Sequence, residues 1–240
     1  SGPPILTATR VDGGYRLNGT VPWVTGYRLY HEFLIGAALE DGTSVFGVVP
    51  FTPTETNGGS IEFGEVMKLA AMESPQTVAA NLENFLLSDE MVAFTKPAGW
   101  IQDNDLINIT LQAFFALGCA RAGVDQMDKA YQAKGIEAIA EAKQALEAEL
   151  NECREKMIAV QANSDEDVPT DEKLKIRAWA IDLAARCAHA GVAANSGASN
   201  SVRHHAQRVY REALVFTVSA QTKPIMEATL KRLTERGGFR

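Results

Sequence analysis

Few residues of this chain combine a reactive side chain with a spacing that chemistry requires. Three cysteines, Cys119, Cys153 and Cys187, are far apart, and each falls in a stretch with helical character. We therefore expect core thiols in a reducing compartment and no disulfide framework. His31 and His189 have no cysteine or carboxylate at a metal-ligand spacing, so we predict no metal site.

Basic residues gather at one place, where Arg203, Arg208 and Arg211 lie near the expected start of a helix. A cationic cluster at a helix start can meet a cofactor phosphate. The simpler interpretation is that these arginines pair with surface acids, and we prefer it.

The composition narrows the classes of function and location. The chain has 240 residues, 46% hydrophobic content and a formal net charge of -7, which argues against a nucleic-acid partner. The apolar run 106–122 is interrupted by polar residues and is too short to span a bilayer, so we predict no membrane association. The first residues, Ser1-Gly2-Pro3-Pro4, have neither the positive start nor the apolar core of a secretory signal. Together with the cysteine pattern, this leads us to expect a cytoplasmic protein.

Residues 1–98 have the apolar runs and turn clusters of a small antiparallel β-sandwich or barrel. The clearest expected strands are 5–11, 15–24, 32–39 and 43–51, with further strands at 61–67 and 77–87. Asp12-Gly13 and Asp41-Gly42 supply the positive φ angles that tight hairpin turns demand. We also assign Asn18-Gly19 to a turn.

From residue 99 the composition shifts to Ala, Leu, Glu, Lys and Gln, which predicts an up-down four-helix bundle over residues 99–240. The expected helices cover about 103–133, the apolar stripe 139–160, about 169–192, and about 202 onward. An acidic loop at 164–169 and a Gly/Ser/Asn stretch at 195–201 separate them. Pro224 lacks a backbone donor and should kink the last helix or start a new one near Thr222. The predicted fold class is α+β multidomain.

One segment carries a family resemblance. Residues 14–26, Gly-Tyr-Arg-Leu-Asn-Gly-Thr-Val-Pro-Trp-Val-Thr-Gly, resemble the middle-domain signature of acyl-CoA dehydrogenases. The helix segment 114–128, the small-residue turn 196–199 and the helix segment 208–213 are similar to further parts of the same family.

The resemblance implies a flavoprotein oxidoreductase that binds FAD and acts on an acyl-CoA or a related substrate. It makes Trp23, Val24 and Thr25 the flavin-edge candidates, because a flat conjugated ring favours an aromatic neighbour and hydrogen-bond donors. Thr222 matches a family threonine that contacts the cofactor, although it also suits a helix cap. A homodimer or homotetramer through the helical bundle is implied as well.

Several departures from the family pattern affect the expected reaction. The usual catalytic Glu falls at Ala220, and alanine cannot abstract an α-proton. The alternative base position, near 110–112, also lacks a carboxylate, and Lys134 is a weak substitute for a family arginine. The family's helical N-terminal domain has no counterpart here, so we expect an open acyl pocket.

Two alternatives therefore stay open. A reduced-flavin-dependent monooxygenase of the same fold does not need the missing Glu, and the His204-His205 pair could donate a proton there, although it lies about four turns from Ala220 at standard helical rise. A non-catalytic relative that kept only the fold is the other alternative.

Overall fold

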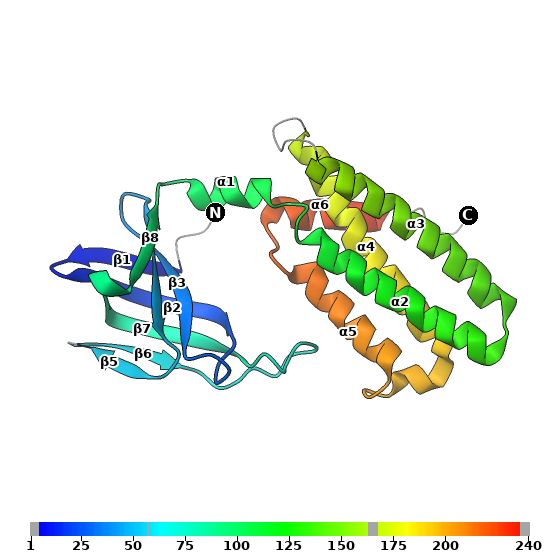
Figure 1. Ribbon diagram of the computed structural model, residues 1–240, viewed down its shortest axis with the longest axis horizontal. Helices are drawn as coiled ribbons and strands as arrows, with labels where there is room; N and C mark the ends of the chain where they lie inside the picture. The colour runs from blue at the N-terminus through cyan, green and yellow to red at the C-terminus, as the bar shows by residue number, and fades with distance from the viewer. Residues whose placement is uncertain (1–4, 57, 163–167, 236–240) are drawn as a thin grey trace. The chain divides into compact units, whose positions relative to one another are not determined.

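The computed structural model describes residues 5–56, 58–162 and 168–235. The chain forms two units, Ser1–Asp103 and Asn104–Arg240, and the short helix α1 (Trp100–Ile107) contains the boundary (Figure 1). All described strands belong to the first unit and all described long helices to the second. The predicted order of a β-domain followed by a helical bundle is confirmed.

The first unit is built on one eight-stranded sheet with the strand order β5-β6-β7-β2-β1-β3-β4-β8. Six pairings are antiparallel, whereas β1 and β3 run parallel and share one bridging pair, Thr7 and Ala38. The sequence patterns did not separate out the two short strands β5 and β8. In chain order the strands are β1 (Leu6–Val11), β2 (Gly14–Thr25), β3 (Glu32–Ala38), β4 (Ser44–Pro50), β5 (Thr54–Thr56), β6 (Gly59–Phe63), β7 (Thr77–Ser88) and β8 (Val92–Lys96).

The expected hairpins form where turn residues predicted them. Gly13 (φ +75°) closes the β1–β2 turn and Gly42 (φ +83°) lies in the β3–β4 turn. Both backbones occupy the left-handed region that glycine tolerates best. These two turn predictions are confirmed.

Aromatic contacts show that the sheet curls on itself. Phe63 of β6 lies 6.0 Å from the Phe33 ring of β3, and 5.3 Å from Phe51 directly after β4, between ring centroids. Three strands separate β6 from β3 in the sheet order, so only a strongly curved sheet brings these rings together. One continuous core inside this curve is the barrel-like form of the predicted β-domain.

Two irregularities interrupt the β2–β7 ladder. One is an extra residue in β7 near Asn84 (φ +48°), and the other is an extra residue in β2 between Val21 and Val24. The insertions are on opposite strands, so pairing returns to its original register by Thr25 and Thr77. A β-bulge of this kind bends a strand and redirects the side chains beside it.

The assignment of Asn18-Gly19 to a turn is wrong, because both residues lie inside β2. The Asn18 side chain accepts a hydrogen bond from the backbone N–H of Asn84 (2.8 Å), which the β7 bulge leaves outside the regular ladder. A Cβ on Gly19 would lie 2.2 Å from the carbonyl oxygen of Ile5. The pair therefore serves strand packing and bulge pairing.

The second unit is organised around α4, which packs against each of the helices α2, α3, α5 and α6 (Figure 1). The predicted helix breaks at 195–201 and near Thr222 are confirmed. Part of the acidic loop, residues 164–167, lies outside the described residues. The helices are α2 (Ala113–Lys134), α3 (Glu137–Ala162), α4 (Thr170–Asn195), α5 (His205–Val218) and α6 (Lys223–Glu235), with a 3₁₀ turn at Ser196–Asn200.

The prediction of one helix over 103–133 is wrong, because α1 ends at Ile107 and α2 begins at Ala113. Contacts from elsewhere in the unit stabilise the break. Arg177 of α4 donates a hydrogen bond to the Ile109 carbonyl oxygen (3.0 Å), and Gln161 of α3 donates one to the Thr110 hydroxyl. These partners are distant in sequence, so local patterns could not reveal them.

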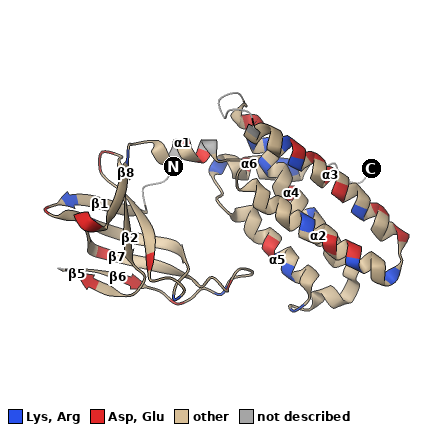
Figure 2. Ribbon diagram, viewed as in Figure 1, with Lys and Arg blue, Asp and Glu red and all other residues tan. Residues whose placement is uncertain are grey.

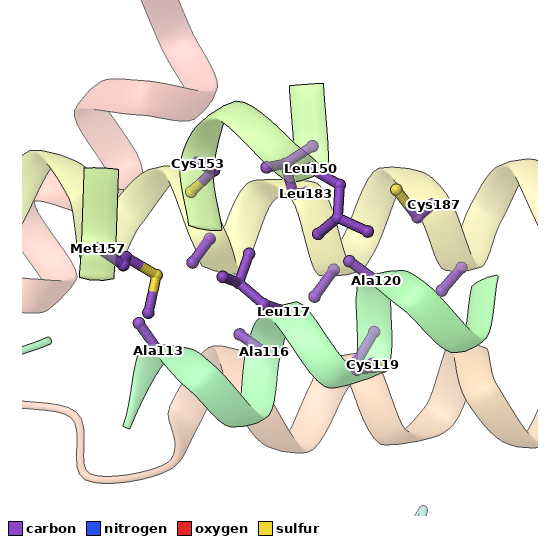
Figure 3. Packing of buried hydrophobic residues seen from close by; sticks show 14 of the residues in the cluster. Ala113, Ala116, Leu117, Cys119, Ala120, Leu150, Cys153, Met157, Leu183 and Cys187 are labelled. Carbon is purple, nitrogen blue, oxygen red and sulfur yellow. The ribbon is translucent and has the colours of Figure 1, made fainter. Parts of the chain in front are cut away.

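The bundle core is made of small and medium side chains (Figure 3). The stripe predicted for the second helix is buried here through Leu150, Cys153, Met157 and Val160. At Gly123, a Cβ would lie 2.4 Å from the Cys187 carbonyl carbon, so α2 and α4 approach each other backbone to backbone. Interiors packed this closely tolerate little added volume.

Charged residues of both signs lie along the bundle helices, as α3 illustrates (Figure 2). Inside the unit, Asp182 is buried and ties α6 to α4 through Arg232 (3.1 Å) and also contacts Arg186 (3.4 Å). Among the described helices, none has the length and apolar content to cross a membrane.

Candidate functional site

The β2 bulge determines how the three flavin-edge candidates point. Pro22 lies in the bulge and cannot donate to the ladder because proline has no N–H. Trp23 is 62% exposed, whereas Val24 is buried in the β core. Side chains alternate along a strand, so Thr25 lies on the same face as Trp23. Because the Val24 side chain points into the core, only its backbone N–H and C=O groups are available to a ligand on that face.

The exposed face of β2 continues into the following loop. The Thr25 and Thr77 hydroxyl oxygens are 3.1 Å apart, so the Thr25 side chain is oriented by a hydrogen bond and keeps further capacity. Leu29 and Tyr30 are 54% and 67% exposed. Large apolar side chains exposed next to one another are typical of a surface that binds a ligand or a partner protein.

The segment between α5 and α6 carries the other candidates. Ala220 adopts φ +46°, and Thr222 directly precedes α6, where its carbonyl oxygen accepts the Met226 N–H (2.9 Å). Both residues line a cavity of about 280 Å³ inside the helical unit. A methyl side chain at Ala220 offers no proton acceptor, as the sequence predicted.

Arg177 of α4 lines the same cavity, and the sequence reasoning missed it. It is 2% exposed, and its guanidinium donates to the carbonyl oxygens of Ile109 (3.0 Å) and Ser219 (2.8 Å). Burial lowers the pKa of the Arg177 guanidinium, since removal from water disfavours the charged form. The available signal was that Arg177 directly precedes the apolar run 178–181, because arginine is seldom fully buried.

One carboxylate, that of Asp105 on α1, also lines this cavity. Its side chain is exposed to solvent. A general base for α-proton abstraction needs a desolvated setting next to its substrate. Asp105 in this position does not replace the family's Glu.

Several other polar candidates have structural partners. His204 caps α5, since its Nδ1 accepts the Ala206 N–H (3.2 Å). Arg208 pairs with Glu212 (3.5 Å), as the surface-acid interpretation predicted, whereas Arg211 donates to the Val202 carbonyl oxygen (3.4 Å) and to the Gln207 side chain. Lys134 donates to the Ala194 carbonyl oxygen (2.6 Å) and so holds the end of α4.

The three cysteines are core residues, as predicted, and all are free thiols. Burial raises the pKa of Cys119, Cys153 and Cys187 to about 12 in each case. A thiol with such a pKa stays protonated at neutral pH and is a poor nucleophile. Within the described ranges, no group of three or more His, Cys, Asp and Glu residues is arranged to hold a metal ion.

Comparison with solved structures gives the fold a precedent. The chain superposes on a glutaryl-CoA dehydrogenase from Mycobacterium smegmatis in complex with FADH2 with a TM-score of 0.75 and 18% identity over 98% of this chain. A putative acyl-CoA dehydrogenase from Mycobacterium smegmatis gives 0.78 at 13% identity over 97%, and butyryl-CoA dehydrogenase from Megasphaera elsdenii gives 0.73 at 16% identity over 95%.

The coverage is unequal in the two directions. This chain spans 62%, 64% and 63% of those three chains. No protein-family model and no curated protein sequence matches it. Identities below one fifth establish the fold and leave activity open. Over nearly its whole length, therefore, this chain has the fold of the acyl-CoA dehydrogenases.

Proposed function

We propose that this protein is a FAD-dependent oxidoreductase of acyl-CoA dehydrogenase type, acting on an acyl-CoA or a related substrate. The observation that carries the proposal is the fold shared, over 95–98% of this chain, with a glutaryl-CoA and a butyryl-CoA dehydrogenase. The resemblance of residues 14–26 to the family's flavin-edge segment supports it independently. Fold alone does not determine chemistry, so the site residues need their own argument.

The side chains at the end of β2 fit a flat aromatic cofactor. Trp23 presents an indole outside the β core, and Thr25 presents an oriented hydroxyl on the same strand face. We assign Trp23 to packing against the flavin ring and Thr25, with the main chain of Val24, to its polar edge. Thr222 is the fourth proposed contact. Bound FAD would supply a two-electron acceptor, and the protein residues would orient it and exclude water.

The reaction itself is constrained by Ala220, which cannot take the α-proton of a thioester. This observation favours a second candidate function, a reduced-flavin-dependent monooxygenase of the same fold, which has no need of that base. A non-catalytic relative is a third. His204 gives no special support to the monooxygenase, because its Nδ1 caps α5.

Flavin binding is the first experiment. The purified protein is mixed with excess FAD, and retained flavin absorbance and thermal stability are measured. We expect a stoichiometric complex, a raised melting temperature, and a roughly five- to tenfold weaker affinity for Trp23→Ala, since one stacked aromatic contributes about 1–1.5 kcal/mol. Trp23→Phe should restore most of the affinity. A wild-type protein that retains no flavin and shows no thermal shift rejects the proposal.

The reaction type needs a separate experiment on the flavin complex. Anaerobic bleaching of the flavin by butyryl-CoA would indicate dehydrogenation. Oxygen consumption by the chemically reduced complex, coupled to oxygenation of an added substrate, would indicate a monooxygenase. Stoichiometric flavin with neither activity leaves the non-catalytic relative.

We also propose that the bundle self-associates as a homodimer or homotetramer. On α5, Tyr210, Leu214 and Val218 are exposed at a spacing of four residues, so they form one apolar stripe. Exposed Leu230 and Leu233 add apolar surface on α6. Light scattering after size exclusion should give a multiple of 26.0 kDa, the mass of one chain, and Leu214→Glu should reduce it.

A further inference from the structure

Arg177 retains hydrogen-bonding capacity that its protein partners do not use. A guanidinium carries five N–H donors. Nη1 donates to the Ile109 carbonyl oxygen (3.0 Å) and Nη2 to that of Ser219 (2.8 Å), while Nε is buried without a partner among the described residues. A buried donor left unpaired is costly, so such a group is a candidate for pairing with a ligand.

The charge of Arg177 is also uncompensated within the described part of the chain. No carboxylate among the described residues forms a salt bridge with Arg177. Both acceptors of the Arg177 hydrogen bonds are neutral carbonyl groups. Asp105 lines the same cavity, but it is exposed to solvent and makes no ion pair there. Arginine remains charged at any pH where proteins fold. A buried cation of this kind favours an anionic partner.

The cavity beside Arg177 has a suitable size and lining for a small organic anion. Its volume is about 280 Å³, several times the roughly 30 Å³ that one water occupies in the liquid. Amide and hydroxyl groups meet apolar side chains around it. The polar lining residues are Asn104, Asn108, Gln112 and Thr222, and the larger apolar ones are Ile109, Leu111 and Ile225.

We propose that this cavity binds the carboxylate of a short aliphatic acid, with Arg177 as the charged contact and Ile109 and Ile225 along the alkyl chain. A planar carboxylate matches the edge of a guanidinium, and one cation balances one negative charge better than a phosphate dianion. The charged and alkyl contacts of this proposal are distinct from the proposed flavin contacts, although Thr222, which also lines the cavity, is one of the latter.

Isothermal titration calorimetry of the purified, flavin-free protein tests this directly. The probe is sodium butyrate against sodium chloride of equal ionic strength, with butyramide as the neutral isostere. We expect one saturable butyrate site with a Kd on the order of millimolar, and butyramide at least about tenfold weaker. No saturable butyrate binding, equal binding of butyramide, or tighter binding of inorganic phosphate overturns the proposal.

Two variants locate the site. Arg177→Lys keeps the charge and loses the planar fork, and we expect roughly tenfold weaker butyrate binding. Asp105→Asn removes a negative charge from the cavity lining at an exposed position, where a substitution is expected to change stability little, and it should tighten binding about threefold. Butyrate affinities that are unchanged in both folded variants place the ligand elsewhere and overturn the assignment. Since no flavin is present, failure of the flavin experiment leaves these results interpretable.

Discussion

Trp23 and Arg177 are among the side chains that reverse the usual partition between surface and interior. Trp23 of the β unit is 62% exposed, and Arg177 of the helical unit is 2% exposed. Each is accompanied by a local irregularity, a bulge in β2 for the tryptophan and the break between α1 and α2 for the arginine. The difference is what holds them: Arg177 is fixed by partners from distant segments, whereas Trp23 leaves the core without forming such bonds. We therefore expect substitution of exposed Trp23 to leave the free energy of unfolding nearly unchanged, and substitution of buried Arg177 to lower it.

The largest expected effect concerns the packing of α2 against α4, the helix that carries Arg177. Gly123→Val would place side-chain carbon where α2 and α4 already touch, 2.4 Å from the Cys187 carbonyl carbon. We expect a loss of about 4 kcal/mol or no stable fold, since overpacking at backbone contact is among the most damaging changes. Urea denaturation followed by circular dichroism measures it.

Gly118→Ala on the same helix is the matched control. A Cβ at Gly118 would have no neighbour within 4 Å, so the helix gains propensity without a clash. We expect a stabilisation of about 0.5–1 kcal/mol. Equal effects of the two substitutions would contradict the close approach of α2 and α4.

Arg177→Met should lower the free energy of unfolding by about 2–3 kcal/mol. The substitution leaves the carbonyl oxygens of Ile109 and Ser219 without their donor, and unpaired buried acceptors carry that order of cost. Chemical denaturation with a two-state fit provides the measurement. A stability equal to wild type would mean that the arginine does not stabilise the two loops.

Trp23→Ala should change the free energy of unfolding by no more than about 0.5 kcal/mol, because an exposed side chain gives up little burial. The same variant should lose flavin affinity as described above. Phe85→Ala, on the paired strand and fully buried, is the contrasting control, with an expected loss of about 3–5 kcal/mol. If both variants lost similar stability, Trp23 would be a core residue and the contrast with Arg177 would fail.

Much of the fold followed from local sequence signals. Strands bounded by Gly13 and Gly42, and the helix restart near Pro224, depend on the conformational limits of single residues, which a sequence states directly. The break at 108–112 did not, because it contains neither glycine nor proline and is stabilised by Arg177 and Gln161 from other helices. Asn18-Gly19 misled for the same reason, since its partner Asn84 is distant in sequence.

The candidate site was predictable to a similar degree. The family resemblance proposed Trp23 and Thr25 as flavin contacts, which stays a prediction, and alternation along the strand accounts for their shared face. The cavity beside Ala220 was not predictable, because its lining residues come from three separated stretches of the chain, near 104–112, at Arg177 and near 220–225. Only folding brings these stretches together, so the sequence alone could not show that Arg177 lines a cavity.

The paired irregularities of β2 and β7 constrain how this segment can change. A single residue inserted in one strand shifts every later pair, in the manner of a frameshift, and moves side chains to the wrong face. The second insertion lies in the other strand and restores the original register, so only the pairs from Gly19 to Val21 are shifted by one residue. Deleting Pro22 alone would remove the extra residue of β2, and the shift caused by the extra residue of β7 would then continue to the end of the ladder. We therefore expect related sequences to carry both insertions or neither.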